Sequence, residues 1–220
     1  MEALVLEGEM GAASKNPRIR LRPFSGESMD DYATVLEGSE MGRLVMSAPD
    51  WQEAVTEGLS SPYRLAYLVY LSDSGEIAGR CDARGIGNDR WELGIDLLET
   101  GRRKGLEAET LSTLMDTLML ERGQHAFLMR IAPDQAASIR LARSLGGYPA
   151  GISRSPLITD KEREATFEKT HAWFADKVDP ALAEEFGVEP KSLITHVLIF
   201  NIDWDGVCEK DERVTEAPGQ

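Results

Sequence analysis

The segment ELGIDLLETGRRKGLEAETL, residues 92–111, constrains the fold more than any other, because its hydrophobic period changes in the middle. An apolar strand pattern comes first, and a turn with two arginines, a lysine and Gly105 follows it. Beyond Gly105 the apolar residues recur at helical spacing, and Gly123 marks the expected end of that helix. HAFLMRI, residues 125–131, is a further strand pattern. A strand, a helix and a second strand in this order predict a crossover unit whose two strands are parallel.

Strand patterns also occupy the chain before this unit. Three of them are rich in β-forming residues and are joined by the short segments SDSGE and GND, which predicts an antiparallel meander. The three strands are expected at residues 63–71, 77–86 and 90–98. RIRLRPF, residues 18–24, is a fourth strand pattern. Helices are expected in two segments before the meander, residues 28–38 and 51–59.

The C-terminal part of the chain combines helices with extended segments. PDQAASIRLARSLGG, residues 133–147, predicts a helix that Asp134 caps and that Gly146 or Gly147 ends. A longer helix is expected over residues 159–178, and ITHVLIFNIDW predicts a last strand. The chain therefore divides into four expected parts: a loose leader at 1–16, one domain at 17–204, a helical insertion in it at about 158–190, and a polar tail at 205–220.

The charge balance limits the classes of partner. The formal net charge is -14 at pH 7, which argues against nucleic acid as the main partner because phosphate binding needs a basic face. The same sign attracts cationic ligands such as amines. Cys81 and Cys208 fit no metal-ligand spacing and no disulfide framework. We see no signal peptide and no run of roughly 20 apolar residues, and therefore expect a cytoplasmic protein without a membrane partner.

The turn after the central strand has the composition of a phosphate site. Arg102, Arg103 and Lys104 supply positive charge, and Gly105 allows a close backbone approach. The helix that starts there presents free backbone N–H groups at its positive end. A phosphate or pyrophosphate is the ligand that such a turn prefers. Basic residues in a short turn are also commonly only solvated, so both interpretations stand for this motif alone.

Two motifs in order connect the chain to a known family. ELGIDLLETGRRKGLE, residues 92–107, aligns without a gap with the ELGI strand and Arg-x-x-Gly-x-Gly/Ala turn of the GNAT acetyltransferase superfamily. It resembles especially the branch similar to ribosomal-protein alanine acetyltransferases. PDQAASIRLARSLGG matches that branch's Asn-x-x-Ser-Ile-Arg-Leu helix at the expected distance. The resemblance covers most of residues 17–204. It implies an α/β (α+β) fold with a GNAT-like mixed, mainly antiparallel central sheet, a splayed parallel strand pair and flanking helices.

The resemblance also implies a co-substrate and a reaction. Acetyl-coenzyme A would lie between the splayed strands, and the primary amine of a small molecule or a peptide would attack its acetyl carbonyl directly. Backbone groups of the first splayed strand would hold the pantetheine arm, and the basic turn would hold the pyrophosphate. The cofactor-binding residues implied in this way are Leu97, Leu98, Arg102, Arg103, Lys104, Gly105, Leu106, Glu107, Gln135 and Ser138. No metal is implied.

The chain departs from the family pattern at several of these positions. Glu107 stands where the family has the last Gly or Ala of the pyrophosphate turn. Its carboxylate would repel a pyrophosphate unless it swings to solvent or pairs with Arg103. Ala142 stands where many members carry a tyrosine that protonates the leaving thiolate. Gly147 replaces a phenylalanine, and the neighbouring Tyr148 is a candidate source of the missing hydroxyl.

Glu92 is the best candidate for the general base. Some family members keep a catalytic glutamate on this strand, and a base must reach the amine directly or through water. The alternative is a half-exposed carboxylate that pairs with Arg90 or Arg130. His171, on the apolar stripe of the helix expected at 159–178, is a second candidate, although such a histidine is more often packed.

Two functions follow from these observations. The first is an N-acetyltransferase that moves acetyl from acetyl-coenzyme A to a primary amine. The second is a catalytically weakened member of the same fold that serves as a binding or interaction protein, for which Glu107, Ala142 and Gly147 argue. The apolar stripe of the insertion must bury against something, either as a lid over the acceptor cleft or on a second subunit in a homodimer. The acceptor amine stays open.

Overall fold

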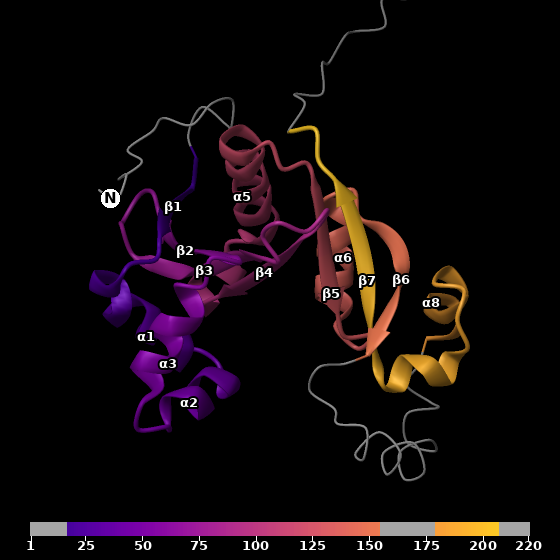
Figure 1. The fold of residues 1–220 in the computed structure, drawn as a ribbon, viewed down its shortest axis with the longest axis horizontal. Coiled ribbons are helices and arrows are strands. Elements are labelled where there is room, and N and C mark those ends of the chain that lie inside the picture. The colour runs from indigo at the N-terminus through magenta and orange to yellow at the C-terminus, as the bar shows by residue number, and fades with distance from the viewer. Residues whose placement is uncertain (1–16, 155–178, 207–220) are drawn as a thin grey trace, which may run out of the picture.

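The centre of the protein is a seven-stranded sheet with the order β1-β2-β3-β4-β5-β7-β6 (Figure 1). The structure is a computed structural model that describes residues 17–154 and 179–206, so the helix predicted at 159–178 lies outside the described residues. Every neighbouring pair of strands is antiparallel except β4 and β5, which confirms the predicted mixed sheet. The strands are β1 (Ile19–Pro23), β2 (Arg64–Leu71), β3 (Ile77–Arg84), β4 (Trp91–Leu97), β5 (Ala126–Ile131), β6 (Tyr148–Arg154) and β7 (His196–Asp203).

The predicted meander is confirmed by β2, β3 and β4, which pair in sequence order with tight connections. Gly79 of β3 shows why the chain carries a glycine in this sheet. Its φ is 154°, and a Cβ added there would lie 2.7 Å from the Cα of Leu97 on β4. A side chain at this position would therefore force β3 away from the end of β4.

Helices cover both faces of the sheet. They are η1 (Gly26–Ser28), α1 (Met29–Glu37), α2 (Glu40–Met46), α3 (Trp51–Leu59), α4 (Glu99–Arg103), α5 (Glu107–Arg122), α6 (Ala136–Ser144), α8 (Pro180–Glu185) and η2 (Pro190–Ile194). The larger core joins one sheet face to α5 and α6, and its α5 residues are Leu111, Leu114, Met115 and Leu118. A smaller core joins the other face of β2 to α1 and α3. Gly123 ends α5 with a left-handed φ of 65°, as predicted.

Two local details differ from the sequence predictions. Asp134 does not cap α6: the N-cap is Gln135, and no side chain bonds to the first turn. The Ala132 carbonyl accepts from the Gln135 amide and the Asp134 carbonyl from the Ala136 amide instead, and the helix starts one residue later than predicted. The short helices α2 and α4 were not predicted, and α4 forms because the carbonyl of Leu98 accepts from the amide of Arg102. Within the described ranges, no helix is long and apolar enough to cross a membrane.

Candidate functional site

The parallel strands β4 and β5 separate soon after they meet. They pair at two positions only, Trp91 with Phe127 and Glu92 with Leu128, and the rest of each strand diverges. The register with β3 shows which backbone groups face the gap. The amide of Leu98 donates to Ala78 on β3 at 2.8 Å, and antiparallel pairing alternates such groups between the two sides of a strand. The residues of β4 whose amides point away from β3, toward the diverging β5, are Leu93, Ile95 and Leu97.

Leu97 and Leu98 therefore differ in what their backbones can offer a ligand. The Leu98 amide is occupied by Ala78, and the Leu98 carbonyl accepts from Arg102 at 3.0 Å. Gly101 draws the following turn close to the sheet, because a Cβ at that position would lie 2.9 Å from the Ala78 carbonyl oxygen. Of the two residues that the sequence assigned to the pantetheine arm, Leu97 presents its backbone to the gap.

The basic turn is held by its own hydrogen bonds. The amide of Gly105, with φ of 62°, donates to Arg102, and the amide of Leu106 donates to Gly101 at 3.3 Å. The Leu106 side chain is fully buried in the larger core. The first amides of α5, beginning at Glu107, have no acceptor within the helix. The free donors at this end of the molecule are thus the amides of the first turn of α5.

The charged side chains of the turn have different partners. Arg103 pairs with Glu99 one helical turn earlier, and of the two alternatives for Glu107, a pairing with Arg103 is not formed among the described residues. Lys104 Nζ lies 3.6 Å from Asp73 in the β2–β3 turn, and the pKa of Asp73 is lowered by the Ser74 amide and then by this lysine. Neither Arg102 nor Glu107 has an ion-pair partner in the part of the chain that the structure describes.

Arg18, just before β1, fixes the position of the turn, and sequence reasoning missed it. Its Nη1 donates to the Lys104 carbonyl at 3.0 Å, while its backbone amide and Nε donate to the two carboxylate oxygens of Glu109 at 2.9 and 2.7 Å. The contact joins positions about ninety residues apart, so no local pattern could have indicated it. It ties the beginning of α5 to the edge of the sheet.

Glu92 lies on the opposite face of β4 from α5. Its carboxylate oxygens lie 3.2 Å from Nη2 of Arg84 on β3 and 3.5 Å from Nη1 of Arg130 on β5. The pairing with Arg130 was one of the two predicted alternatives, whereas Arg84 was missed. The side chain of Glu92 is 21% exposed, which leaves it within reach of a ligand. The candidate base therefore lies across the place where β4 and β5 part.

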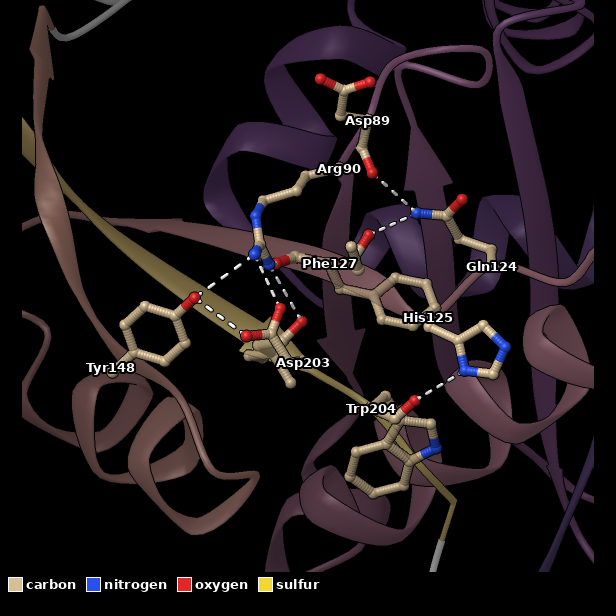
Figure 2. A network of polar contacts seen from close by, with 10 residues as sticks. Asp89, Arg90, Gln124, His125, Phe127, Tyr148, Asp203 and Trp204 are labelled. Carbon is tan, nitrogen blue, oxygen red and sulfur yellow. Dashed lines mark hydrogen bonds and ion pairs between the residues drawn. The ribbon is translucent and has the colours of Figure 1, made fainter.

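Tyr148 lies at the closed end of this strand pair, in the network of Figure 2. Its hydroxyl donates to Asp203 at 3.0 Å and accepts from Arg90 at 3.3 Å. Arg90 also binds Asp203 at 2.7 Å and the carbonyls of Phe127 and Ile202. Hydrogen bonds from Arg90 and then Tyr148 lower the pKa of the Asp203 carboxyl. The Tyr148 hydroxyl, which the sequence suggested as a proton donor, thus belongs to a hydrogen-bond network that connects β6, β7 and the residue before β4.

The remaining predicted residues lie at the open end of the strand pair. Gln135 is exposed at the start of α6, directly after β5, and Ser138 is half-buried one turn later. Ala142, at the position of the family tyrosine, is fully buried. Among the described residues, no group of three histidine, cysteine or acidic side chains is placed to hold a metal ion.

A mixed sheet whose one parallel pair opens toward a helix N-terminus defines the class of acetyltransferases with the GNAT fold. A family model described as "Acetyltransferase (GNAT) domain" matches residues 18–147, more than half of the chain, so the chain belongs to this family. No curated protein sequence matches it.

Solved structures support the same fold at low sequence identity. The chain is similar to RimL, a ribosomal L7/L12 alpha-N-protein acetyltransferase in complex with coenzyme A, with a TM-score of 0.61, 14% identity, and coverage of 86% of this chain and 96% of that one. It is also similar to the spermidine N-acetyltransferase of Vibrio cholerae in complex with coenzyme A and spermine, with a TM-score of 0.57, 13% identity, and coverage of 86% of this chain and 96% of that one. A third similar structure is a putative ribosomal-protein-serine acetyltransferase from Vibrio cholerae, with a TM-score of 0.56, 12% identity, and coverage of 86% of this chain and 95% of that one.

Proposed function

We propose that the protein is an N-acetyltransferase that moves an acetyl group from acetyl-coenzyme A to a primary amine by direct attack. One observation carries this proposal. The strands β4 and β5 pair at only two positions and then diverge, so β4 turns a row of backbone groups toward the gap. Family membership supports the same reaction class.

The pantetheine arm would extend along the free edge of β4, bonded to the backbone of Leu97, Ile95 and Leu93 in the manner of an added strand. The pyrophosphate would lie at the first turn of α5, where amide donors and the positive end of the helix favour an anion. Arg102 is exposed beside it without an ion-pair partner in the described part of the chain, so its guanidinium can turn to the phosphates. Gln135 and Ser138 at the start of α6 would border the same ligand.

The reaction needs a neutral amine, a polarised carbonyl and a proton for the leaving group. The amine nitrogen forms the new bond to the acetyl carbon, and the carbon–sulfur bond breaks to release the coenzyme A thiolate. A backbone amide of β4 that faces the gap at the inner end of the pantetheine arm would donate to the developing oxyanion. Glu92 would take the amine proton, directly or through water. Tyr148 as proton donor to the thiolate stays a prediction, because its hydroxyl is bonded to Asp203.

The proposal is tested by calorimetric titration with acetyl-coenzyme A, followed by release of free thiol in the presence of a panel of amines. Glu92→Gln should lower turnover by roughly 10²–10⁴-fold while the affinity for acetyl-coenzyme A stays unchanged. The matched control is Asp96→Asn, because Asp96 is also a half-exposed acid of β4 in an ion pair, with Arg80. Full activity of Glu92→Gln would remove this residue from the mechanism.

A binding protein without catalysis is the second candidate. The specific observation in its favour is Glu107, an acid at the first position of α5 with no ion-pair partner in the described ranges. The fully buried Ala142 supports it, because an alanine cannot supply the proton that a tyrosine would. Absence of both heat and thermal stabilisation with millimolar acetyl-coenzyme A would favour this candidate over the enzyme.

A further inference from the structure

A row of alternating charges crosses the sheet on the face that carries Glu92. It runs through Arg64, Asp82, Arg84, Glu92 and Arg130, and we call it the charged row. Asp82 forms an ion pair with Arg64 at 2.6 Å and lies 3.5 Å from Arg84, and Glu92 lies between Arg84 and Arg130, within ion-pair distance of both. Three guanidinium groups thus share two carboxylates, so the row has an excess of positive charge. The whole chain, in contrast, has a net charge of -14.

The two arginines that flank Glu92 are the most accessible members of the row. The side chains of Arg84 and Arg130 are 45% and 46% exposed, whereas those of Asp82 and Glu92 are 13% and 21% exposed. Gly94 of β4 makes room for this arrangement, because a Cβ there would lie 2.1 Å from the Asp82 carboxylate. A molecule that approaches this face therefore meets guanidinium groups first.

The charged row ends where β4 and β5 separate. Glu92 and Leu128 form the last pair of β4 and β5, and Arg130 lies two residues further along β5, beside the gap. Leu106 and the buried side of α5 pack on the other face of the sheet, in the larger core with the apolar side of β4. An acyl donor with its phosphates at α5 would reach through the gap, and its acceptor would then approach from the side of the charged row.

Both ion pairs of Glu92 are longer than the ion pair between Asp82 and Arg64 at the opposite end of the row. Glu92 lies 3.2 and 3.5 Å from its two arginines, compared with 2.6 Å between Asp82 and Arg64. Arg130 forms an ion pair with Glu92 through Nη1 at 3.5 Å, and its guanidinium has further N–H donors for a second carboxylate. A planar guanidinium with free donors matches the geometry of planar oxyanions, and a carboxylate can bind it by two parallel hydrogen bonds.

We propose that the acceptor is an amino-carboxylate, meaning an amine that carries a carboxylate a few bonds away, as in a free amino acid or a short acidic peptide. The amine would lie at Glu92 and the carboxylate at Arg130, with Arg84 as the second cation. A polyamine has several positive charges and no anion, so the accessible arginines would repel it. This inference rests on the proposed acetyltransferase function and names the substrate class of that site.

The test compares acceptors that differ only in the carboxylate. Thiol release from acetyl-coenzyme A is measured with glutamate, with an acidic dipeptide, with the carboxamide of each, and with spermidine. We expect kcat/KM for an acid to exceed that for its carboxamide by roughly ten- to a hundredfold, the scale of one hydrogen bond to a charged group. Comparison of kcat/KM for glutamate and for the dipeptide shows whether the acceptor is a free amino acid or a short acidic peptide.

The arginine variants assign the preference to the charged row. Arg130→Gln should abolish the difference between acid and carboxamide, mainly through KM, while Arg130→Lys should retain part of it. Arg122→Gln, a change of an exposed arginine at the far end of α5, is the matched control and should leave the preference intact. Calorimetry with acetyl-coenzyme A should give the same affinity for the wild type and for all three variants.

The outcomes distinguish a wrong substrate class from a wrong proposed function. If acetyl-coenzyme A binds and the kcat/KM for spermidine or for the carboxamides equals or exceeds that for the acids, the substrate class is wrong and the proposed function stands. The same holds if the coenzyme binds and an amine without a carboxylate is acetylated while none of the carboxylates is. If acetyl-coenzyme A does not bind, the proposed function fails and the substrate class fails with it.

Discussion

Replacing Glu107 by glutamine should strengthen the binding of acetyl-coenzyme A. Glu107 is the first residue of α5, half-buried, and has no ion-pair partner among the described residues, so no cation offsets its charge locally. The proposed pyrophosphate site is the same helix end. Glutamine keeps the length and hydrogen-bonding capacity of the side chain and removes only the charge, which makes it a cleaner change than glycine.

The magnitude follows from Coulomb's law. Two unit charges about 6 Å apart interact with roughly 0.7 kcal/mol in bulk water and roughly 3 kcal/mol at an effective dielectric of 20. A half-exposed carboxylate belongs nearer the lower value, so we expect a gain of about 1 kcal/mol, or about fivefold in Kd. The same substitution should lower the free energy of unfolding by about 0.3–1 kcal/mol, because an acid in the first turn stabilises the helix dipole. Tighter binding and lower stability should therefore occur together.

Isothermal titration with acetyl-coenzyme A at low and at high salt measures both the gain and its electrostatic origin. The gain should shrink at high salt, where charges are screened within a few ångströms. Glu121→Gln is the matched control: it lies on the same helix about 21 Å away, about twice the Debye length of roughly 10 Å at 0.1 M salt. Unchanged or weaker binding by Glu107→Gln, or an equal gain by Glu121→Gln, would refute the argument.

Substitutions at three further positions test the packing and the ion pairs around the site. Leu106→Ala removes a fully buried side chain and should lower the free energy of unfolding by about 2–5 kcal/mol in urea titrations, whereas Leu106→Met should cost less than about 1.5 kcal/mol. Gly101→Ala should lower the Tm although alanine is the better helix former, because its Cβ would lie 2.9 Å from a β3 carbonyl oxygen; a raised Tm would contradict this close approach. The Asp203 carboxyl has a lowered pKa because of Arg90 and Tyr148, so its contribution to stability is present above about pH 4 and is lost as the pH falls through the folded-state pKa. Asp203→Asn should therefore lose less stability than the wild type on acidification, measured by urea midpoints.

Periodicity in the sequence predicted most of the fold. The alternation of apolar and polar residues indicated the meander, and the change to helical spacing after Gly105 indicated α5, because these patterns depend on neighbours within one strand or helix. The short helices α2 and α4 were not predicted, because helices of seven and five residues are too short to give a clear periodic pattern. The cap of α6 was placed wrongly because backbone carbonyls, which no side-chain pattern reports, took the role assigned to Asp134.

Sequence alone therefore determined the architecture of this protein and the two segments that border its candidate site. Residue types and their local spacing are enough for that, since a strand or a helix selects its apolar face within a few residues. Only the tertiary structure decided which groups at the site are free. It showed that Leu98 bonds to β3, that Arg18 holds the turn from ninety residues away, and that Glu92 joins Arg84 to Arg130. Hydrogen bonds and ion pairs between distant strands depend on sheet register and helix placement, and those arise only when the whole chain packs.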